Sequence, residues 1–288
     1  MTYPEAIQYL ESFINYEKIP AYTYKESLKL ERLKDFLVKI NNPQDSLKCI
    51  HIAGTKGKGS TCAFITYILR QARYKVGLYT SPHLSDFKER IRVLQYSSTP
   101  VLQPSEEFKG MISQKELTGL TQRLKPLIDN YNKNSKYGPL SFFEVYTSLA
   151  FLYFKEKKAD FAVLETGLGG RLDATNVVSP LVAALTPISY EHTQKLGNTL
   201  TEITTEKSGI IKSQKSILRL RSGLMVSRVE PSKVKSQNLI VITAPQEEEA
   251  IEVIRNRCKE MDVKLYEIGK DITYQKTKNG FSVKGIFG

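Results

Sequence analysis

The chain has 288 residues, of which 41% are hydrophobic, and it carries a formal net charge of +12. This length suits one large domain or two modest ones, and no charge-free apolar run approaches the roughly 18 residues of a membrane-spanning helix. The N-terminus lacks a basic region followed by an apolar core, so the sequence predicts no signal peptide. We therefore expect a cytoplasmic globular protein with no membrane partner.

The positive charge indicates polyanionic partners, which could be nucleic acid or a nucleotide together with a carboxylated substrate. No helix-turn-helix, zinc-finger or RNA-binding motif accompanies the charge, so we predict that nucleic acid is not a partner. The cysteines Cys49, Cys62 and Cys258 are odd in number and lack the spacing of metal ligands. They indicate free thiols in a reducing compartment.

Helices and strands alternate along the predicted chain. Apolar spacing predicts helices over residues 3–16, 24–40, 114–133, 142–157 and 246–260, and a further helix that ends near Lys207. Short apolar runs predict strands at residues 47–53, 75–80, 161–165, 181–185 and 239–242, and an edge strand at 89–94. This alternation predicts an α/β fold with a mostly parallel sheet covered by helices on both faces.

Four segments that follow predicted strands carry glycine, hydroxyl or ionisable residues. They are the loop at Gly54, the turn at Ser81, Glu165, and the turn over residues 187–192. Ligands of parallel α/β sheets bind at the carboxyl ends of the strands. We therefore expect these segments to converge at one edge of the sheet.

Residues 51–61, HIAGTKGKGST, lie between a predicted strand and a segment with helical apolar spacing. A glycine-rich turn before a helix presents backbone N–H groups and a positive helix end to phosphate. Lys58 could reach the β- and γ-phosphates, and the hydroxyl of Ser60 or Thr61 could bind phosphate or Mg²⁺. Ile52 and Gly59 depart from the usual phosphate-loop pattern, so a glycine-rich surface turn remains the alternative.

Other candidate residues also admit ordinary roles. Glu165 at a strand end near a phosphate loop suits Mg²⁺, which prefers oxygen ligands, but it could be a simple loop carboxylate. His192 is one of three histidines and could be structural. Lys207 could be a solvated lysine at the favourable end of a helix dipole. Phe142 and Phe143 could belong to a helix core or stack on a flat heterocycle.

The segments GTKGKGS, SPHL, ERIRV, FFE, ETGLGGRLDATN, EH and LGNTLTEITTEKSGIIK together resemble the folylpolyglutamate synthase/dihydrofolate synthase family. This family is the folate branch of the Mur-type ATP-dependent ligases. The resemblance runs from about residue 5 to the end of the chain, and SPHL with GLGGRLDATN is its most specific part. It implies a sheet of the Mur ligase central-domain type with a phosphate-binding loop.

The resemblance also implies roles for individual residues. ATP would be bound by Thr55, Lys56, Gly57, Lys58, Gly59 and Ser60. Two Mg²⁺ ions would be held with the help of Ser81, Glu165 and His192, and the catalytic residues would be Lys58, Lys207 and His192. Lys207 matches a lysine that becomes carbamylated, which would turn a cation into an anion that helps to hold the second metal. The implied folate contacts are Ser27, Leu28, Ser141, Phe142, Phe143, Glu144, Leu172, Asp173 and Ala174.

The implied reaction is ATP-dependent ligation of L-glutamate to the carboxylate of a folate, with dihydropteroate as a further possible substrate. The carboxylate attacks the γ-phosphate of ATP, and the amine of glutamate then displaces phosphate from the acyl phosphate. Charge neutralisation by Lys58 and Mg²⁺ would contribute most to catalysis of the phosphoryl transfer. We expect a monomer whose partners are these small molecules.

The sequence departs from the family in three places. Glu191 stands where the family usually has Asp, and the chain stops at Gly288 where the family continues into a C-terminal domain. We therefore expect residues 1–288 to be the N-terminal ATPase domain, with weak ATP binding and little or no ligation by this chain alone. Residues 213–237 are an apparent insertion, because Lys212-Ser213-Gln214 recurs as Lys235-Ser236-Gln237. We expect them to form a protruding loop, although an ordinary basic surface loop remains the alternative.

Two other functions stay open at this point. The first is a non-catalytic member of the family that folds and binds nucleotide without turnover. The second is a cell-wall Mur ligase acting on a nucleotide-sugar peptide, against which the SPHL and FFE segments argue.

Overall fold

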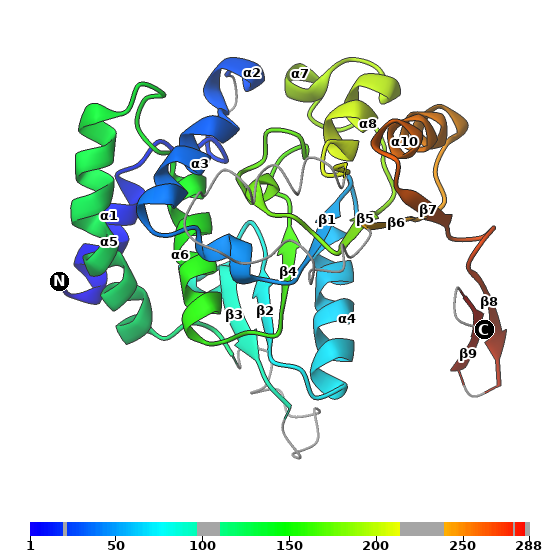
Figure 1. The fold of residues 1–288 in the computed structure, drawn as a ribbon, viewed down its shortest axis with the longest axis horizontal. Helices are drawn as coiled ribbons and strands as arrows, with labels where there is room; N and C mark the ends of the chain where they lie inside the picture. Colours follow the sequence, from blue (N-terminus) through cyan, green and yellow to red (C-terminus); the bar gives the residue numbers. More distant parts are fainter. Residues whose placement is uncertain (20–21, 97–109, 214–238, 279, 286–288) are drawn as a thin grey trace, which may run out of the picture.

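The computed structural model describes residues 1–19, 22–96, 110–213, 239–278 and 280–285 (Figure 1). Of the predicted insertion at 213–237, residues 214–237 lie outside this described part of the chain.

A seven-stranded sheet in the order β3-β2-β4-β1-β5-β6-β7 forms the centre of the described structure. Its strands are β1 (Cys49–Ala53), β2 (Val76–Tyr79), β3 (Ile91–Leu94), β4 (Phe161–Glu165), β5 (Val182–Leu185), β6 (Ile240–Thr243) and β7 (Lys264–Glu267). Neighbouring strands are parallel except for β2 and β3, which are antiparallel. The predicted mostly parallel sheet and its edge strand at β3 are therefore confirmed.

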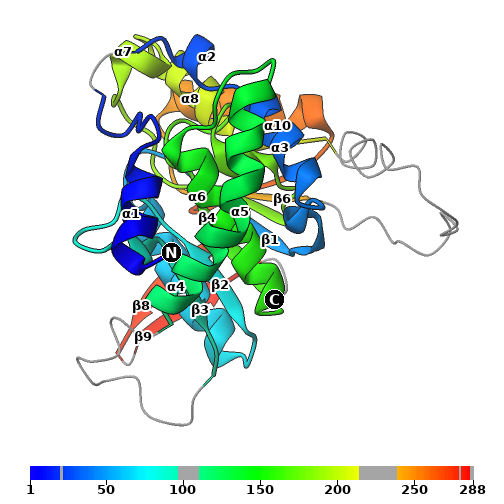
Figure 2. The same ribbon diagram turned by 90° about the vertical axis from the view of Figure 1, so that its left-hand side faces the viewer.

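Helices cover both faces of the sheet, as predicted. On one face, α1 (Tyr3–Glu11), α3 (Leu30–Lys39), α5 (Gln114–Asn134) and α6 (Phe142–Glu156) share a core with β-strand residues such as Cys49 and Leu164. On the opposite face, Cys62 of α4 (Lys58–Gln71) packs against Ile52 and Val163. Because side chains alternate along a strand, neighbouring residues of β1 serve these two cores. Figure 2 shows α1 beside α5.

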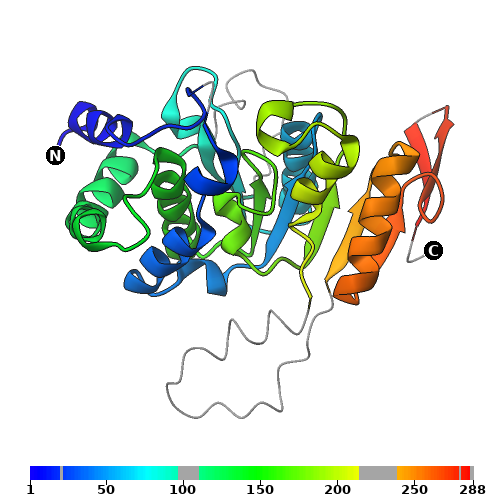
Figure 3. The ribbon, with the colours of Figure 1, turned by 90° about the horizontal axis from the view of Figure 1, so that it is seen from above.

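A second group of helices packs near β5 and β6. α8 (Leu200–Ser208) and α10 (Glu248–Met261) form a core with Ala183, Leu185 and Val241. Figure 3 shows α10 alongside the β6 and β7 end of the sheet. Among the described residues, no helix is both long enough and apolar enough to cross a membrane.

Several predicted boundaries were wrong for local reasons. The helix predicted over 24–40 is divided into α2 (Tyr24–Ser27) and α3, because Leu28 and Lys29 adopt extended backbone conformations. The helix predicted over 3–16 ends at Glu11, where the Ser12 hydroxyl donates to the Tyr9 carbonyl oxygen.

The sequence analysis did not predict α7 (Thr193–Leu196), β7, or the hairpin of β8 (Thr273–Thr277) and β9 (Gly280–Lys284). These elements are short. Every residue of β8 is exposed, so no buried face marks this strand in the sequence. In Figure 1 the hairpin lies beyond β7.

Candidate functional site

The segments predicted to converge do meet at the carboxyl ends of β1, β2, β4 and β5. The Ser81 N–H donates to Glu165 Oε2 over 3.1 Å, which joins the ends of β2 and β4. The Thr55 N–H donates to the Pro187 carbonyl oxygen over 3.0 Å, which joins the ends of β1 and β5. The predicted convergence is therefore confirmed.

The phosphate-loop candidate forms the expected strand–loop–helix unit, with α4 beginning at Lys58. Gly57 lies at φ +81, a left-handed conformation that favours glycine, and it directly precedes α4. Gly54 lies at φ +148, and an added Cβ would come within 1.9 Å of Thr186 Oγ1. Two of the loop glycines are thus required by backbone conformation or by close packing. Lys58 Nζ donates to the Thr55 carbonyl oxygen over 3.4 Å, so the lysine lies along its own loop.

Glu165 is buried directly beside this loop. A Cβ added to Gly59 would lie 3.5 and 3.6 Å from the two carboxylate oxygens, so the carboxylate faces the first turn of α4. Burial raises the pKa of Glu165, while the Ser81 N–H and the charge of Lys58 act in the opposite direction. Carboxylate oxygens that face a phosphate loop suit a hard cation such as Mg²⁺.

His192 precedes α7 in a left-handed conformation with φ 51. Its Nε2 lies 4.0 Å from Glu191 Oε2. Burial lowers the pKa of His192, and Lys207, Lys195 and Lys58 lower it further, against the opposing charge of Glu191. This favours the neutral imidazole, the form that binds metals.

The joint role of Ser81, Glu165 and His192 in binding metal stays a prediction. Within the described ranges, no three His, Cys, Asp or Glu side chains group closely enough to hold a metal by themselves.

Lys207 is not a solvated helix-end lysine, since it is only 2% exposed. Its Nζ donates to the Gly54 carbonyl oxygen over 2.8 Å, so α8 contacts the start of the phosphate loop. Burial is the main cause that lowers the pKa of Lys207 to about 8, and the charge of Lys58 acts in the same direction.

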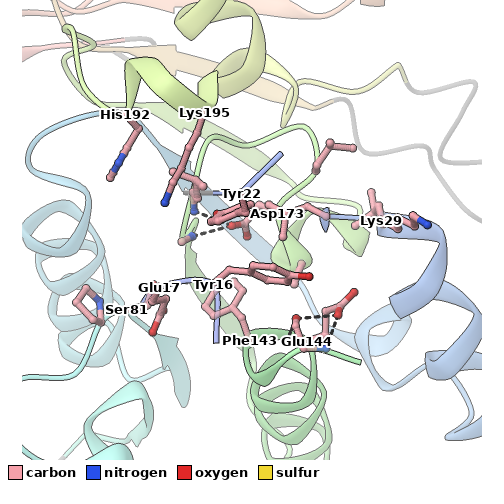
Figure 4. Close-up of a pocket in the computed structure, with 18 residues that line it drawn as sticks. Tyr16, Glu17, Tyr22, Lys29, Ser81, Phe143, Glu144, Asp173, His192 and Lys195 are labelled. Carbon is pink, nitrogen blue, oxygen red and sulfur yellow. Dashed lines mark hydrogen bonds between the residues drawn. The ribbon is translucent and has the colours of Figure 1, made fainter. Parts of the chain in front are cut away.

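A cavity of about 260 Å³ adjoins this edge of the sheet (Figure 4). Ser81 and His192 line it at one side, which places it next to the phosphate-loop candidate. Seven of the predicted folate contacts also line it: Leu28, Ser141, Phe143, Glu144, Leu172, Asp173 and Ala174.

Two predicted folate contacts do not line the cavity. Phe142 is 1% exposed and belongs to the core, where the Arg90 guanidinium lies 5.2 Å from its ring centroid. The Ser27 carbonyl oxygen instead accepts a hydrogen bond from Arg32 Nη2. Of the two roles considered for these phenylalanines, Phe142 therefore belongs to a helix core, whereas its neighbour Phe143 faces the cavity.

Several cavity residues were not singled out from the sequence, notably Tyr16, Glu17, Tyr22 and Lys195. The first three lie in the irregular segment between α1 and α2, which carries no motif. Lys195 lies one helical turn after His192 on α7, and this spacing was a usable signal.

The acidic residues of the cavity wall are held by other groups. Arg32 Nε lies 2.9 Å from both oxygens of Glu144, and Glu144 also caps its own helix together with Ser141. Asp173 is buried and accepts hydrogen bonds from the N–H groups of Gly167 and Leu168. These contacts fix the wall of the cavity.

A seven-stranded, mostly parallel sheet with a glycine-rich loop at the end of its central strand and helices on both faces defines an α/β protein. No protein-family model matches the chain. Over 231 residues, the chain is 38% identical to the dihydrofolate synthase/folylpolyglutamate synthase of Bacillus subtilis, which covers 80% of this chain and 45% of that protein.

Solved structures of folylpolyglutamate synthases are also similar to this chain. A folylpolyglutamate synthase from Thermotoga maritima matches with a TM-score of 0.71 and 33% identity, covering 98% of this chain and 55% of that one. A complex of folylpolyglutamate synthase with AMPPCP and folate matches with a TM-score of 0.75 and 26% identity, covering 98% of this chain and 60% of that one. The chain belongs to the folylpolyglutamate synthase/dihydrofolate synthase family, and it spans about half the length of the relatives that it matches.

Proposed function

We propose that this chain supports ATP-dependent ligation of L-glutamate to the carboxylate of a folate, with dihydropteroate as a further candidate substrate. The observation that carries the proposal is that Ser81 lines the aromatic cavity while its N–H bonds to Glu165, which faces the phosphate loop. A flat acid bound in the cavity would thus present its carboxylate toward a nucleotide on the loop. A relative of this chain has been solved with AMPPCP and folate.

In this proposal, Thr55 to Ser60 bind the phosphates of ATP, and Lys58 neutralises the charge that develops on the γ-phosphate. Mg²⁺ held by Ser81, Glu165 and His192 would add further charge neutralisation when bound. The substrate carboxylate attacks the γ-phosphate and releases ADP. The amine of glutamate then displaces phosphate from the acyl phosphate and forms the amide.

Lys207 is proposed to be carbamylated. Carbon dioxide reacts with an unprotonated amine, and the pKa of about 8 makes the neutral amine more abundant at neutral pH than in an ordinary lysine. The modification would replace a buried cation by an anion close to Gly54 and the phosphate loop.

Titration of the purified chain with Mg²⁺–AMPPCP, followed by addition of ATP, L-glutamate and tetrahydrofolate or dihydropteroate, tests the proposal. The Bacillus subtilis relative serves as the positive control. We expect nucleotide binding that is lost in Lys58→Ala, and a product that mass spectrometry finds heavier by one glutamate residue identifies a ligase. Nucleotide binding with little or no product would agree with the expectation for residues 1–288 alone, and absence of nucleotide binding would contradict the proposal.

A further inference from the structure

The cavity carries an excess of positive charge once its internal ion pairs are considered. Glu144 is paired with Arg32, and Glu17 is paired with Arg90, whose Nη1 and Nη2 lie 2.9 and 2.6 Å from its two oxygens. Asp173 accepts from backbone N–H groups. The carboxylates in the wall therefore already have partners inside the protein.

Lys195 differs from these groups. Its Nζ donates to the Ile19 carbonyl oxygen over 3.3 Å and lies 4.3 Å from the ring centroid of Tyr22. Within the part of the chain that the structure describes, no carboxylate forms an ion pair with it. An ammonium group has three N–H donors, so donors remain for a ligand.

The position of Lys195 determines on which side of the cavity its charge lies. His192 and Lys195 are three residues apart on the short turn that includes α7, and both line the cavity. In Figure 4 both side chains extend toward the cavity from that turn, whereas Lys29 lies on the other side of it. A carboxylate bound by Lys195 would therefore lie on the His192 side of the cavity, where Ser81 also contributes to the wall.

The remaining wall is suited to a flat conjugated molecule. Tyr16, Tyr22 and Phe143 supply aromatic rings, and Leu28 and Leu172 supply apolar surface. Aromatic walls favour stacking with a heterocycle, while the charge at the His192 side favours an acid. The chemistry of the cavity thus matches a heteroaromatic acid with its carboxylates at one end.

We propose that Lys195 is a specificity-determining residue that binds a substrate carboxylate other than the one activated by ATP. The inference rests on the proposed function. It assigns the cavity a preference for acids that carry a second carboxylate, such as the glutamate moiety of folate, over acids that carry only one.

Binding of folate and of pteroate to the purified chain, each measured by isothermal titration calorimetry, tests this assignment. Folate has two carboxylates in its glutamate moiety, whereas pteroate has a single benzoate carboxylate. We expect Lys195→Met to weaken folate binding on the order of ten-fold, as for loss of a charge-assisted hydrogen bond, and to weaken pteroate binding much less. Lys195→Arg should retain the preference for folate, because it keeps the charge.

Lys29→Met is the matched control, since it removes the same charge from the other side of the cavity. It should leave the ratio of folate to pteroate affinity unchanged. Equal weakening of both ligands by Lys195→Met would show that Lys195 only anchors the segment at Ile19, and it would overturn the inference. Failure of both ligands to bind the unaltered chain would contradict the proposed function itself.

Discussion

The ammonium group of Lys207 and the carbonyl oxygen of Gly54 are joined by a buried 2.8 Å hydrogen bond. The contact links the last turn of α8 to the first residue after β1. It brings a buried cation beside a loop that also contains Lys58, and the two charges disfavour each other. This arrangement suits a loop that binds an anion but costs stability when the loop is empty.

Lys207→Met should therefore stabilise the protein at pH 7. The pKa of Lys207 is about 8 in the folded protein, whereas an ordinary lysine, as in the unfolded chain, has a pKa of 10.5, so the unfolded state binds the proton more tightly. Burial of the charged form thus costs about 3 kcal/mol below pH 8, and this cost disappears as the pH rises to the unfolded value. Loss of the hydrogen bond to Gly54 offsets about 1 kcal/mol of the stabilisation that Lys207→Met gains by removing the buried charge.

Urea unfolding in carbon dioxide-free buffer at pH 7 and pH 10 measures the difference in unfolding free energy between Lys207→Met and the unaltered chain. The stabilising effect should shrink at the higher pH. Lys56→Met, at an exposed lysine of the same loop, serves as the control and should change stability little. A destabilised Lys207→Met variant at pH 7 would show that the buried cation is held by interactions stronger than its desolvation cost.

Lys58→Ala should abolish nucleotide binding and any ATP-dependent ligation while the domain stays folded. Lys58 Nζ makes one long hydrogen bond to its own loop, so its removal affects packing little. Loss of a phosphate-neutralising charge costs several kcal/mol of transition-state stabilisation. Nucleotide binding by calorimetry, turnover and thermal unfolding are compared between Lys58→Ala and the unaltered chain. More than about a tenth of the original turnover would argue against the assigned role.

Two glycines of the phosphate loop should respond differently to alanine. Gly54→Ala forces a Cβ into Thr186, whereas Gly57→Ala meets open space and strains only the backbone. We expect a cost of about 1–2 kcal/mol for Gly57→Ala and a clearly larger loss of unfolding free energy for Gly54→Ala. Chemical denaturation of both variants shows which of them loses more unfolding free energy. Equal costs would indicate that Thr186 moves away without penalty.

The Arg32–Glu144 pair should be far more sensitive to loss of one partner than to loss of both. Their side chains are 6% and 7% exposed. Arg32→Met leaves the Glu144 carboxylate buried without its partner, at a cost of about 3–5 kcal/mol, and the double variant Arg32→Met, Glu144→Gln should recover part of it. Thermal unfolding of both variants tests this. A double variant less stable than the single one would reverse the interpretation.

The phosphate loop and its convergence with Ser81 and Glu165 were predictable, because strand–loop–helix patterns and parallel topology leave little freedom at the carboxyl edge. The cavity was less predictable. Arg32 and Glu144 are 112 residues apart, and such pairing depends on tertiary packing. The break at Leu28 and Lys29 was also missed, since neither residue is a strong helix breaker.

The family resemblance supplied what residue patterns alone left open. It assigned Leu28, Leu172 and Phe143 to one substrate site, and all three line the same cavity. It did not separate Phe142 from Phe143, because which of two adjacent aromatic residues faces a ligand depends on the rotation of α6. It also gave no indication of Lys195, whose surroundings come from the segment between α1 and α2.

The most direct test of the central claim is whether nucleotide and folate occupy this chain together. Calorimetric titration of tetrahydrofolate into the chain, with and without saturating Mg²⁺–AMPPCP, measures this. We expect both ligands to bind at once, with Lys58→Ala removing nucleotide binding and Phe143→Ala weakening folate binding, because the cavity lies beside the phosphate loop and not within it. Mutual exclusion of the two ligands, or folate binding unaffected by Phe143→Ala, would contradict the account.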